Sequence, residues 1–361
     1  MTATVGTAQP RPAIPLDARD RGGPAQPLLT VNDLRKHFPL KRSLLERKRS
    51  VVQAVDDVSF SVGKGETLGV VGESGCGKST TARLLMHLIK PDAGEILLDG
   101  EMVGATTGLS IRELRRQVQM VFQDSHASLN PRNQIDDIIA FPARIHGVSP
   151  KAALERAEKL LEQVGLRPAQ FARRYPHELS GGQRQRVNIA RALALEPRLV
   201  ILDEAVSALD KSVEAQVLNL LMDLKARLNL TYVFISHDLN VVRHMSDRVV
   251  VMYLGRVVEA GATSELYRNP RHPYTRALLS AMPTMDPDRR TEVPPLTGDP
   301  PNPINPPSGC RFRTRCAFAE DVCASSVPVL AAASGAHDHA VACHMAITTS
   351  GHSRARCEAR P

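Results

Sequence analysis

The feature that most constrains this chain is a glycine-rich motif that begins at residue 72. An apolar run, Leu68–Val71, leads into the spacing G-x-x-x-x-G-K-S, and Thr80–Leu88 then reads as a helix. Gly72 and Gly77 allow tight turns in which successive backbone N–H groups point inward at an anion. The start of the following helix adds the positive end of its dipole. The sequence therefore predicts a strand, a phosphate-binding loop and a helix in direct succession.

Two side chains at the end of this loop predict the chemistry of its ligand. Lys78 supplies a mobile cation for the outer phosphates of a nucleotide, and the hydroxyl of Ser79 is placed to bind Mg²⁺. A glycine-rich turn alone is more often only a turn, but the strand, the helix and the GKS spacing together favour nucleotide binding. The candidate nucleotide-contacting residues are Gly72, Glu73, Ser74, Gly75, Cys76, Gly77, Lys78, Ser79 and Thr80.

Length and composition are those of a globular protein. The 361 residues suggest about two or three domains, and 42% hydrophobic and 23% charged residues are ordinary values. A net charge of +8 suits nucleic acid, a nucleotide or an anionic membrane surface equally. The sequence contains neither an apolar stretch of about 18 residues nor an apolar signal segment. We therefore expect a cytosolic chain whose six cysteines are thiols or metal ligands rather than disulfides.

Alternating apolar runs and helical patterns predict an α/β fold. The runs that read as strands are Val51–Val62, Leu68–Val71, Ile96–Leu98, Val118–Phe122, Leu199–Leu202, Tyr232–Ile235 and Val249–Met252. From residue 123 to 197 the pattern is mainly helical. One helix there should begin after Ser149, which supplies a capping hydroxyl before a proline, and should stop at Gly165. Apolar positions from Val213 to Leu228 form another helical stripe, which we assign to core packing.

Changes in composition predict the organisation of the chain. The basic stretch 41–49 has no interleaved aromatic residues, so we expect a solvated loop rather than a nucleic-acid arm, with anionic lipid headgroups as another surface for it. The expected segments are a disordered tail at 1–27, a nucleotide domain at 28–270 with a helical subdomain at about 124–197, an HPYT segment and proline-rich linker at 271–308, a C-terminal module at 309–347 and a tail at 348–361.

A pair of carboxylates follows the apolar run Leu199–Leu202. Because this run reads as a parallel strand covered on both faces, Asp203 and Glu204 should lie at the carboxyl edge of a sheet, where ligands bind in such folds. Asp203 suits the Mg²⁺ shell, and Glu204 is placed to polarise an attacking water. Two surface acids at a strand end are the plainer interpretation, which the phosphate loop in the same chain disfavours.

Further motifs occur in a characteristic order. A glycine-rich turn, Leu179–Gln183, opens a helix and offers a second anion site, Gln123 stands at the end of one strand, and His237 follows another. Together with the phosphate loop and the carboxylate pair, these elements resemble the ATP-binding-cassette (ABC) ATPases over residues 28–270. In chain order they are Gly72–Ser79, Gln123, Leu179–Gln183, Asp203-Glu204, Ser207–Asp210 and His237.

The resemblance implies the ligand, the fold and the catalytic groups. It implies ATP and Mg²⁺, a RecA-like core with antiparallel β and helical subdomains, and hydrolysis rather than binding alone. Glu204, His237 and Gln123 are the implied catalytic residues. Gln123 would also contact Mg²⁺ with Ser79 and Asp203.

The resemblance also implies a head-to-tail dimer of cassettes. The phosphate loop of one chain and the signature turn of its partner would then close on the same ATP, which explains two anion-binding turns in one chain. The implied signature residues are Ser180, Gly181, Gly182 and Gln183. Asp210 would link the two sites, and Phe38 would stack on the adenine.

A closer resemblance covers almost the entire chain. The motifs at 72–80, 122–124, 128–132 (SLNPR) and 272–279 (HPYTRALL) are similar to the oligopeptide/dipeptide importer ATPases, most of all to the F-type member of their D/F pair. Ser125 and Ala205 stand where this family commonly has proline. Neither departure removes a catalytic group.

Four cysteines in the C-terminal module predict a metal site. Cys310, Cys316, Cys323 and Cys343 lie within one short segment, and Arg311, Arg313 and Arg315 are expected to favour thiolates there. The family carries this pattern after its HPYT motif, and some members resemble cluster binders. We expect a [4Fe–4S] cluster, with zinc or unligated thiols as the alternatives. Cys76 and Cys357 stand apart and are not expected to be ligands.

The resemblance implies an ATPase that energises peptide import at the cytoplasmic face of the cell membrane. Its implied partners are a second, D-type ATPase subunit, two transmembrane permease subunits and, through the complex, an extracytoplasmic peptide-binding protein, with no nucleic acid. The alternatives are import of another cargo such as a nickel chelate, or a soluble ABC ATPase acting on ribosomes or DNA. The second is disfavoured, because the chain carries neither two cassettes nor a coiled-coil insertion.

Overall fold

The computed structural model describes most of the chain. The described residues are 19–40, 50–124, 127–282, 298–299, 301–332 and 339–355. The basic stretch 41–49, Ser125, the greater part of the proline-rich linker, the first 18 residues and Cys357 lie outside them. Residues 19–27, assigned above to a disordered tail, contact the body of the protein: Lys64 pairs with Asp20, and the backbone N–H of Arg21 donates to Asp99.

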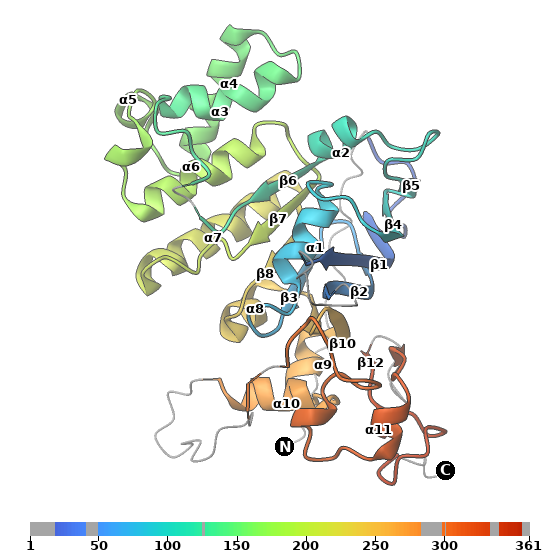
Figure 1. Cartoon of the computed structure of the whole chain (residues 1–361). Helices are drawn as coiled ribbons and strands as arrows, with labels where there is room; N and C mark the ends of the chain where they lie inside the picture. The colour runs from blue at the N-terminus through green and yellow to red at the C-terminus, as the bar shows by residue number, and fades with distance from the viewer. Residues whose placement is uncertain are drawn as a thin grey trace, which may run out of the picture.

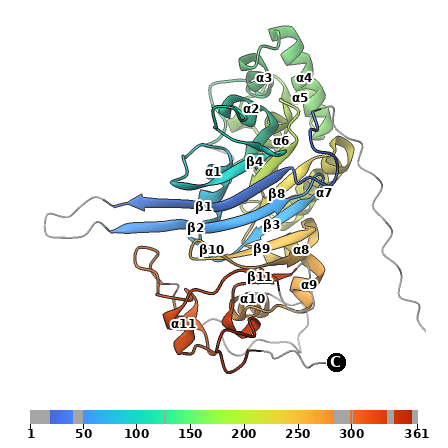
Figure 2. The same ribbon diagram turned by 90° about the vertical axis from the view of Figure 1, so that its right-hand side faces the viewer.

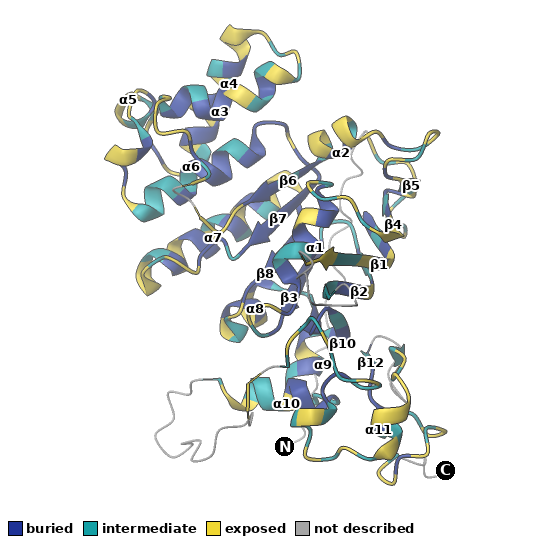
Figure 3. Ribbon diagram, in the orientation of Figure 1, coloured by how far each residue is buried: buried dark blue, intermediate teal, exposed yellow. Residues whose placement is uncertain are grey.

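A mixed eight-stranded sheet forms the centre of the molecule, in the order β11-β12-β10-β9-β3-β8-β7-β6. Five neighbouring strands are parallel: β9 (Arg248–Tyr253), β3 (Thr67–Val71), β8 (Thr231–Ile235), β7 (Leu199–Asp203) and β6 (Val118–Val121). The apolar runs that predicted them are buried almost throughout (Figure 3). Each of these predicted strands is confirmed to within one residue at either end. The antiparallel strand β10 (Arg256–Ala262) extends this sheet.

A second, antiparallel sheet carries the N-terminal part of the chain. Its order is β2-β1-β4-β5, from β1 (Leu29–Pro39), β2 (Val51–Val62), β4 (Ala93–Leu98) and β5 (Glu101–Met102). Figure 2 shows β1 and β2 as two long neighbouring strands beside the central sheet. The predicted strand Val51–Val62 is confirmed with the same bounds.

Helix α1 (Lys78–Leu85) follows the phosphate loop, and both of its ends differ from the predicted helix Thr80–Leu88. It begins two residues before Thr80, because Gly77 takes a left-handed conformation and is the residue from which the helix starts. It ends before Leu88, because His87 has φ +49° and cannot continue a right-handed helix. The other helices of this part are α2 (Ile111–Gln117), α7 (Lys211–Leu228), α8 (Leu239–Met245) and α9 (Thr263–Arg268).

A group of helices stands at one end of the molecule (Figure 1). Helix α4 begins as predicted, because Ser149 Oγ accepts the N–H of Ala152, and the chain turns at Gly165 with φ +75°. The helices of this subdomain are α3 (Ile135–Ile145), α4 (Pro150–Gln163), α5 (Pro168–Phe171) and α6 (Gly181–Leu193).

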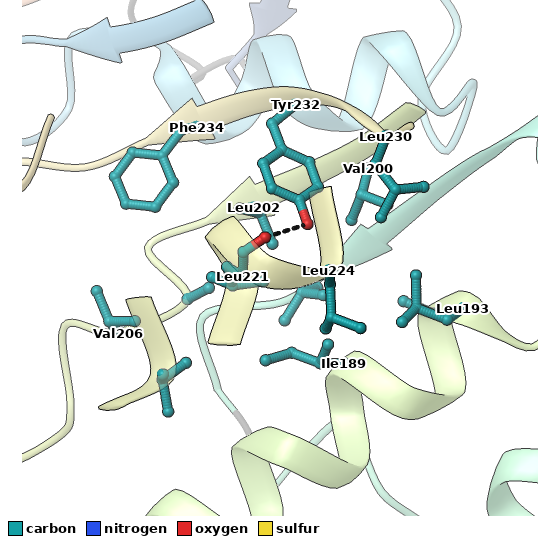
Figure 4. Close-up of a cluster of buried hydrophobic side chains, with 14 of the residues drawn as sticks. Ile189, Leu193, Val200, Leu202, Val206, Leu221, Leu224, Leu230, Tyr232 and Phe234 are labelled. Atoms are coloured by element: carbon teal, nitrogen blue, oxygen red, sulfur yellow. Dashed lines mark hydrogen bonds between the residues drawn. The ribbon is translucent and has the colours of Figure 1, made fainter. Parts of the chain in front are cut away.

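One large cluster of buried apolar residues lies where α6 and α7 cover the central sheet, and a second joins this sheet to α1 and the antiparallel sheet. Figure 4 shows apolar side chains from both helices against Val200, Leu202 and Phe234. The hydroxyl of Tyr232 is also buried there and donates to the carbonyl of Leu221 at 2.9 Å. The apolar stripe of α7 is therefore core from Val213 to Leu224, as predicted, whereas Leu228 at the end of the helix is exposed.

The C-terminal part continues the central sheet at the end away from the helical subdomain (Figure 2). Strand β12 (Ala340–Val341) pairs with β10, and β11 (Ala331–Ala332) pairs with β12. The short elements are α10 (Pro273–Ser280), α11 (Asp321–Ser325) and single 3₁₀ turns at Arg313–Arg315 and His344–Ala346. Among the described residues, no helix is long and apolar enough to cross a membrane.

A buried hydrogen bond between His339 and Glu259 joins this part to the sheet. His339 Nε2 lies 2.7 Å from Glu259 Oε1, and both side chains are almost fully buried. Burial alone would raise the pKa of Glu259, but hydrogen bonds from His339 and from the N–H groups of Arg271 and His272 lower it below its ordinary value. The carboxylate is therefore held ionised in the core.

We expect His339→Leu to lower the free energy of unfolding by about 2 kcal/mol at pH 7, because the buried Glu259 carboxylate would lose a hydrogen-bond partner. The pKa of Glu259 is lowered by folding, so its contribution is present above the ordinary 4.5 and is lost as the pH falls through the folded value. Denaturant unfolding at several pH values measures this. The control is His244→Leu, at an exposed position of α8. Equal stability of the two variants would contradict the prediction.

Candidate active site

The phosphate loop packs so closely that glycine is required at both of its fixed positions. Gly72 has φ +151° and Gly77 has φ +107°. A Cβ at Gly72 would lie 2.2 Å from the carbonyl oxygen of Met252, and one at Gly77 would lie 2.2 Å from that of Ala54. The loop is thus held between β9 of the central sheet and β2 of the antiparallel sheet, with its backbone free to face a ligand.

Lys78 lies under this loop. Its side chain is buried, and Nζ donates to the carbonyl oxygens of Gly72 at 2.7 Å and Glu73 at 3.1 Å. The ammonium group therefore sits against the backbone that would surround a phosphate. Cys76 lies beside it, and burial raises the pKa of its thiol, so this cysteine is neutral.

Two of the three residues predicted to bind Mg²⁺ are in direct contact with each other. Ser79 Oγ donates to Asp203 Oδ1 at 3.0 Å, where the ends of α1 and β7 meet. Burial raises the pKa of Asp203, and the hydrogen bond from Ser79 offsets this only in part. Hydroxyl and carboxylate oxygens are the ligands that Mg²⁺ prefers, so these residues fit the ion.

The three predicted catalytic residues converge on one carboxylate. Gln123 Nε2 donates to Glu204 Oε2 at 2.8 Å, and His237 Nδ1 lies 3.5 Å from the same oxygen. They meet because β6, β7 and β8 are adjacent, so that the residues after their carboxyl ends share one edge of the sheet. Glu204 has φ +48°, a sparsely populated conformation that is held by its N–H bond to the carbonyl of Ile235.

The signature turn lies on the helical subdomain. Ser180 caps α6: its Oγ accepts the N–H of Gln183, and Gln183 Oε1 accepts the N–H of Ser180. Gly181 and Gly182 form the first turn of this helix, and Asp210 is exposed at the start of α7. Within the described part of the chain, no hydrogen bond or ion pair joins these residues to the phosphate loop.

Phe38 is on the antiparallel sheet. It is 36% exposed, Lys36 Nζ lies 5.6 Å above its ring, and it pairs across the hairpin with Val52. Val52 is two residues from Ala54, whose carbonyl contacts the phosphate loop at Gly77. An exposed aromatic ring in this place can stack on a planar base.

A cavity of about 600 Å³ opens beside Ser79, Gln123 and Asp203. Its wall continues along the helical subdomain to Arg191. A larger cavity of about 870 Å³ lies near the amino ends of β7 and β8, with Lys64 and Arg198 in its lining, and holds none of the predicted site residues. Of these two cavities, only the one at the carboxyl edge is therefore lined by predicted site residues.

Two contacts to the phosphate loop were not predicted. The backbone N–H of Glu73 donates to the hydroxyl of Tyr274, and the carboxylate of Glu73 pairs with Arg315. Tyr274 belongs to the HPYT motif. The family resemblance rests in part on this motif, but no contact was predicted for it. Arg315 lies 242 residues from Glu73, and nothing in the local sequence links them.

The four C-terminal cysteines converge, and burial disfavours the thiolate form of Cys310, Cys316 and Cys343. All four line one cavity of about 10 Å³. Burial raises the pKa of Cys310 to about 11 and that of Cys343 to about 12. The expectation that neighbouring arginines favour thiolates is wrong, because these guanidinium groups bind elsewhere: Arg311 to Asp56, Arg313 to Ser308 and Arg315 to Glu73.

The described residues contain no group of three or more His, Cys, Asp or Glu side chains placed to hold a metal ion. The donor set therefore fits a metal in kind and number but not in spacing. The present spacing of these side chains therefore does not form the ligand set of the predicted [4Fe–4S] cluster or of the zinc alternative.

Comparisons with known proteins agree with the site. The family profile described as ABC transporter matches residues 55–207, and that described as oligopeptide/dipeptide transporter, C-terminal region, matches 258–323. The chain is 51% identical over 322 residues to the oligopeptide transport ATP-binding protein AppF of Bacillus subtilis (strain 168), covering 88% of this chain and 97% of that protein. It is 50% identical over 322 residues to OppF of Salmonella typhimurium, covering 88% and 95%.

Solved structures show the same fold. CbiO1 of Clostridium perfringens aligns with TM-score 0.57 and 27% identity, covering 68% of this chain and 92% of that one. The ATP-binding cassette MJ0796, solved as a dimer in a post-hydrolysis state with ADP and Pi, aligns with TM-score 0.55 and 28% identity, covering 65% and 98%.

The fold and the converging residues thus define an ATP-hydrolysing ABC ATPase. The chain belongs to the ATP-binding subunits of the oligopeptide/dipeptide ABC transporter family.

Proposed function

We propose that this chain hydrolyses ATP to energise the import of peptides through a membrane ABC permease. The observation that carries the proposal is the junction of Gln123, Glu204 and His237, an intact hydrolytic set in a chain half identical to oligopeptide transport ATP-binding proteins. A regulatory cassette that only binds ATP would not need this set.

The position of each residue supports the role that we propose for it. The loop N–H groups and Lys78 bind the phosphates, and Ser79 and Asp203 hold Mg²⁺, which neutralises phosphate charge. Glu204 orients and polarises the attacking water, while Gln123 and His237 fix its carboxylate and face the γ-phosphate. Phe38 stacks on the adenine.

The complete site requires a second cassette. Ser180, Gly181, Gly182 and Gln183 form an anion-binding helix start that serves the ATP of the partner chain, and Asp210 joins the two sites. The partner is a D-type subunit, this chain being the F-type. Closure of the pair and its release after hydrolysis move the helical subdomain against two permease subunits, and an extracytoplasmic binding protein delivers the peptide.

Reconstitution tests this function. We expect the purified complex, in lipid vesicles with its binding protein, to accumulate labelled oligopeptides only when ATP is supplied on the cassette side. Uptake of a nickel chelate but not of peptides would move the cargo to that alternative. ATPase activity that is stimulated by ribosomes or DNA, with no uptake, would contradict transport.

We also propose a metal centre at Cys310, Cys316, Cys323 and Cys343. Its support is that four sulfurs line one cavity in a segment too small to bury an extensive core. The side chains must move to ligate a metal, since their present spacing does not. The centre would act as a structural staple.

Elemental analysis after purification without oxygen decides this proposal. We expect about four irons and about four sulfides per chain, as a [4Fe–4S] cluster requires. One zinc would indicate a structural zinc site, and no metal would leave thiols and refute the proposal. Cys316→Ser should lower thermal stability and complex assembly more than the ATPase rate, and Cys76→Ser should leave the metal content unchanged.

A further inference from the structure

We propose that Arg315 is a positioning residue for ATP binding, through which the C-terminal module (residues 309–347) holds the phosphate loop in its receptive shape. Arg315 would touch neither ATP nor the reacting water. It acts through Glu73, the residue that follows Gly72 in the loop. The proposal concerns ATP binding by the cassette and holds whatever the four cysteines ligate.

The contact between Arg315 and Glu73 has the geometry of a strong ion pair. Nη1 of Arg315 lies 2.7 Å from Oε2 of Glu73, and Nη2 lies 3.1 Å from Oε1. The Arg315 side chain is 5% exposed and that of Glu73 is 23% exposed. Two parallel, charge-assisted hydrogen bonds fix the orientation of a carboxylate as well as its distance. Because Arg315 is almost buried, salt in the solvent screens the pair weakly.

The backbone of Glu73 is held at the same time. Its N–H donates to the Tyr274 hydroxyl at 2.8 Å, and its carbonyl accepts from Lys78 Nζ. Tyr274 is fully buried, with its ring centroid 4.6 Å from that of Tyr253 and 5.4 Å from that of Phe312. Phe312 belongs to the C-terminal module. This aromatic cluster is therefore a rigid support under the first half of the loop.

The module also braces the second half of the loop. Arg311 donates to Asp56 and to the carbonyl of Leu254. Gly255, which follows Leu254, donates its N–H to the carbonyl of Cys76 at 2.8 Å. The phosphate loop is thus supported at Glu73 and at Cys76 by one structural unit. Residues distant in sequence decide the direction of its N–H groups.

This arrangement predicts which kinetic constant changes. Phosphate binding depends on the inward direction of the loop N–H groups and on the position of Lys78. Gln123, Glu204 and His237 follow other strands and make no described hydrogen bond or ion pair with Arg315. Loss of the clamp should therefore weaken ATP binding and leave the hydrolytic step nearly unchanged.

The test uses the purified complex with Arg315→Gln, which removes the charge but keeps a polar side chain. We expect the KM for MgATP to rise about tenfold, within the range for loss of a charged hydrogen-bond partner, with kcat changed by less than about twofold. Equilibrium binding of a fluorescent ATP analogue should weaken by the same factor. Arg315→Lys should restore part of the affinity. The matched control is Arg313→Gln, whose guanidinium makes hydrogen bonds only to Ser308 among the described residues.

A double-mutant cycle makes the test specific to the pair. Glu73→Gln removes the same ion pair from the loop side, and we expect the double variant with Arg315→Gln to bind ATP no more weakly than either single variant. Additive losses, or a fall in kcat at unchanged KM, would overturn the proposal. If Arg315→Gln fails to assemble, the Glu73→Gln and Arg315→Lys complexes decide the question by the same KM criterion. None of these measurements involves peptide, so failure of the import proposal would leave their outcome intact.

Discussion

Glu204→Gln is expected to reduce ATP turnover by about 10²–10⁴-fold, the range for loss of a general base. The amide keeps the shape of the side chain and its contact with Gln123, but it cannot accept a proton from water. Asp203, Ser79 and the phosphate loop are unchanged, so binding of MgATP should persist. The variant should therefore accumulate closed pairs of cassettes with ATP trapped between them.

Two measurements check this expectation on the purified complex: phosphate release at saturating MgATP, and the amount of nucleotide retained after rapid gel filtration. The control is Glu158→Gln, an exposed carboxylate on α4 for which no hydrogen bond is described. Near-normal hydrolysis by the Glu204→Gln complex would refute the role of Glu204 and, with it, the interpretation of the converging Gln123 and His237 contacts.

Lys78→Ala is expected to impair the ATP site of its own chain, whereas Ser180→Arg is expected to impair the site of the partner chain. Lys78 lies beneath the phosphate loop of its own chain, so its loss should weaken ATP binding in cis by about 10–100-fold, the range for hydrogen bonds to charged groups. Ser180 is exposed at the start of α6, away from that loop. Arginine there should leave ATP binding in cis intact and should block hydrolysis at the site that the turn completes in the partner.

Complexes of mixed subunits separate these effects. Each substitution is placed on one chain at a time, and ATP binding and hydrolysis are then assigned to the two sites. Ser149→Arg is the matched control, because Ser149 also caps a helix of the same subdomain but does not belong to the signature turn. If Lys78→Ala and Ser180→Arg both act only on the site of their own chain, the head-to-tail arrangement is wrong.

Local physics explains which parts of this protein could be predicted from the sequence alone. Continuous apolar runs mark strands covered on both faces, so the bounds of β7 and β8 were accessible without coordinates. Ser149 and Gly165 delimit α4 through a cap and a left-handed turn, which depend on neighbouring residues only. The phosphate loop was predictable because Gly72 and Gly77 are each demanded by backbone geometry.

The convergence of Gln123, Glu204 and His237 is an intermediate case. Each was predicted to follow a strand, which for Glu204 was a parallel strand, and the carboxyl ends of neighbouring parallel strands share one edge of the sheet. That the three strands are neighbours was not predicted and comes from the strand order of the central sheet. The structure adds that all three side chains meet at one carboxylate oxygen.

Only the tertiary structure decided which charged groups pair across the chain. Arg311 and Arg315 flank cysteines in sequence, and local reasoning assigned their charge to the thiols. In the folded chain both arginines find carboxylates instead, Asp56 and Glu73, because an ionised partner in a partly buried place stabilises a guanidinium more than a neutral thiol can. Glu259 likewise finds its partner 80 residues away, at His339. Periodicity and capping act over a few residues, whereas the pairing of buried charges depends on which surfaces the topology brings together.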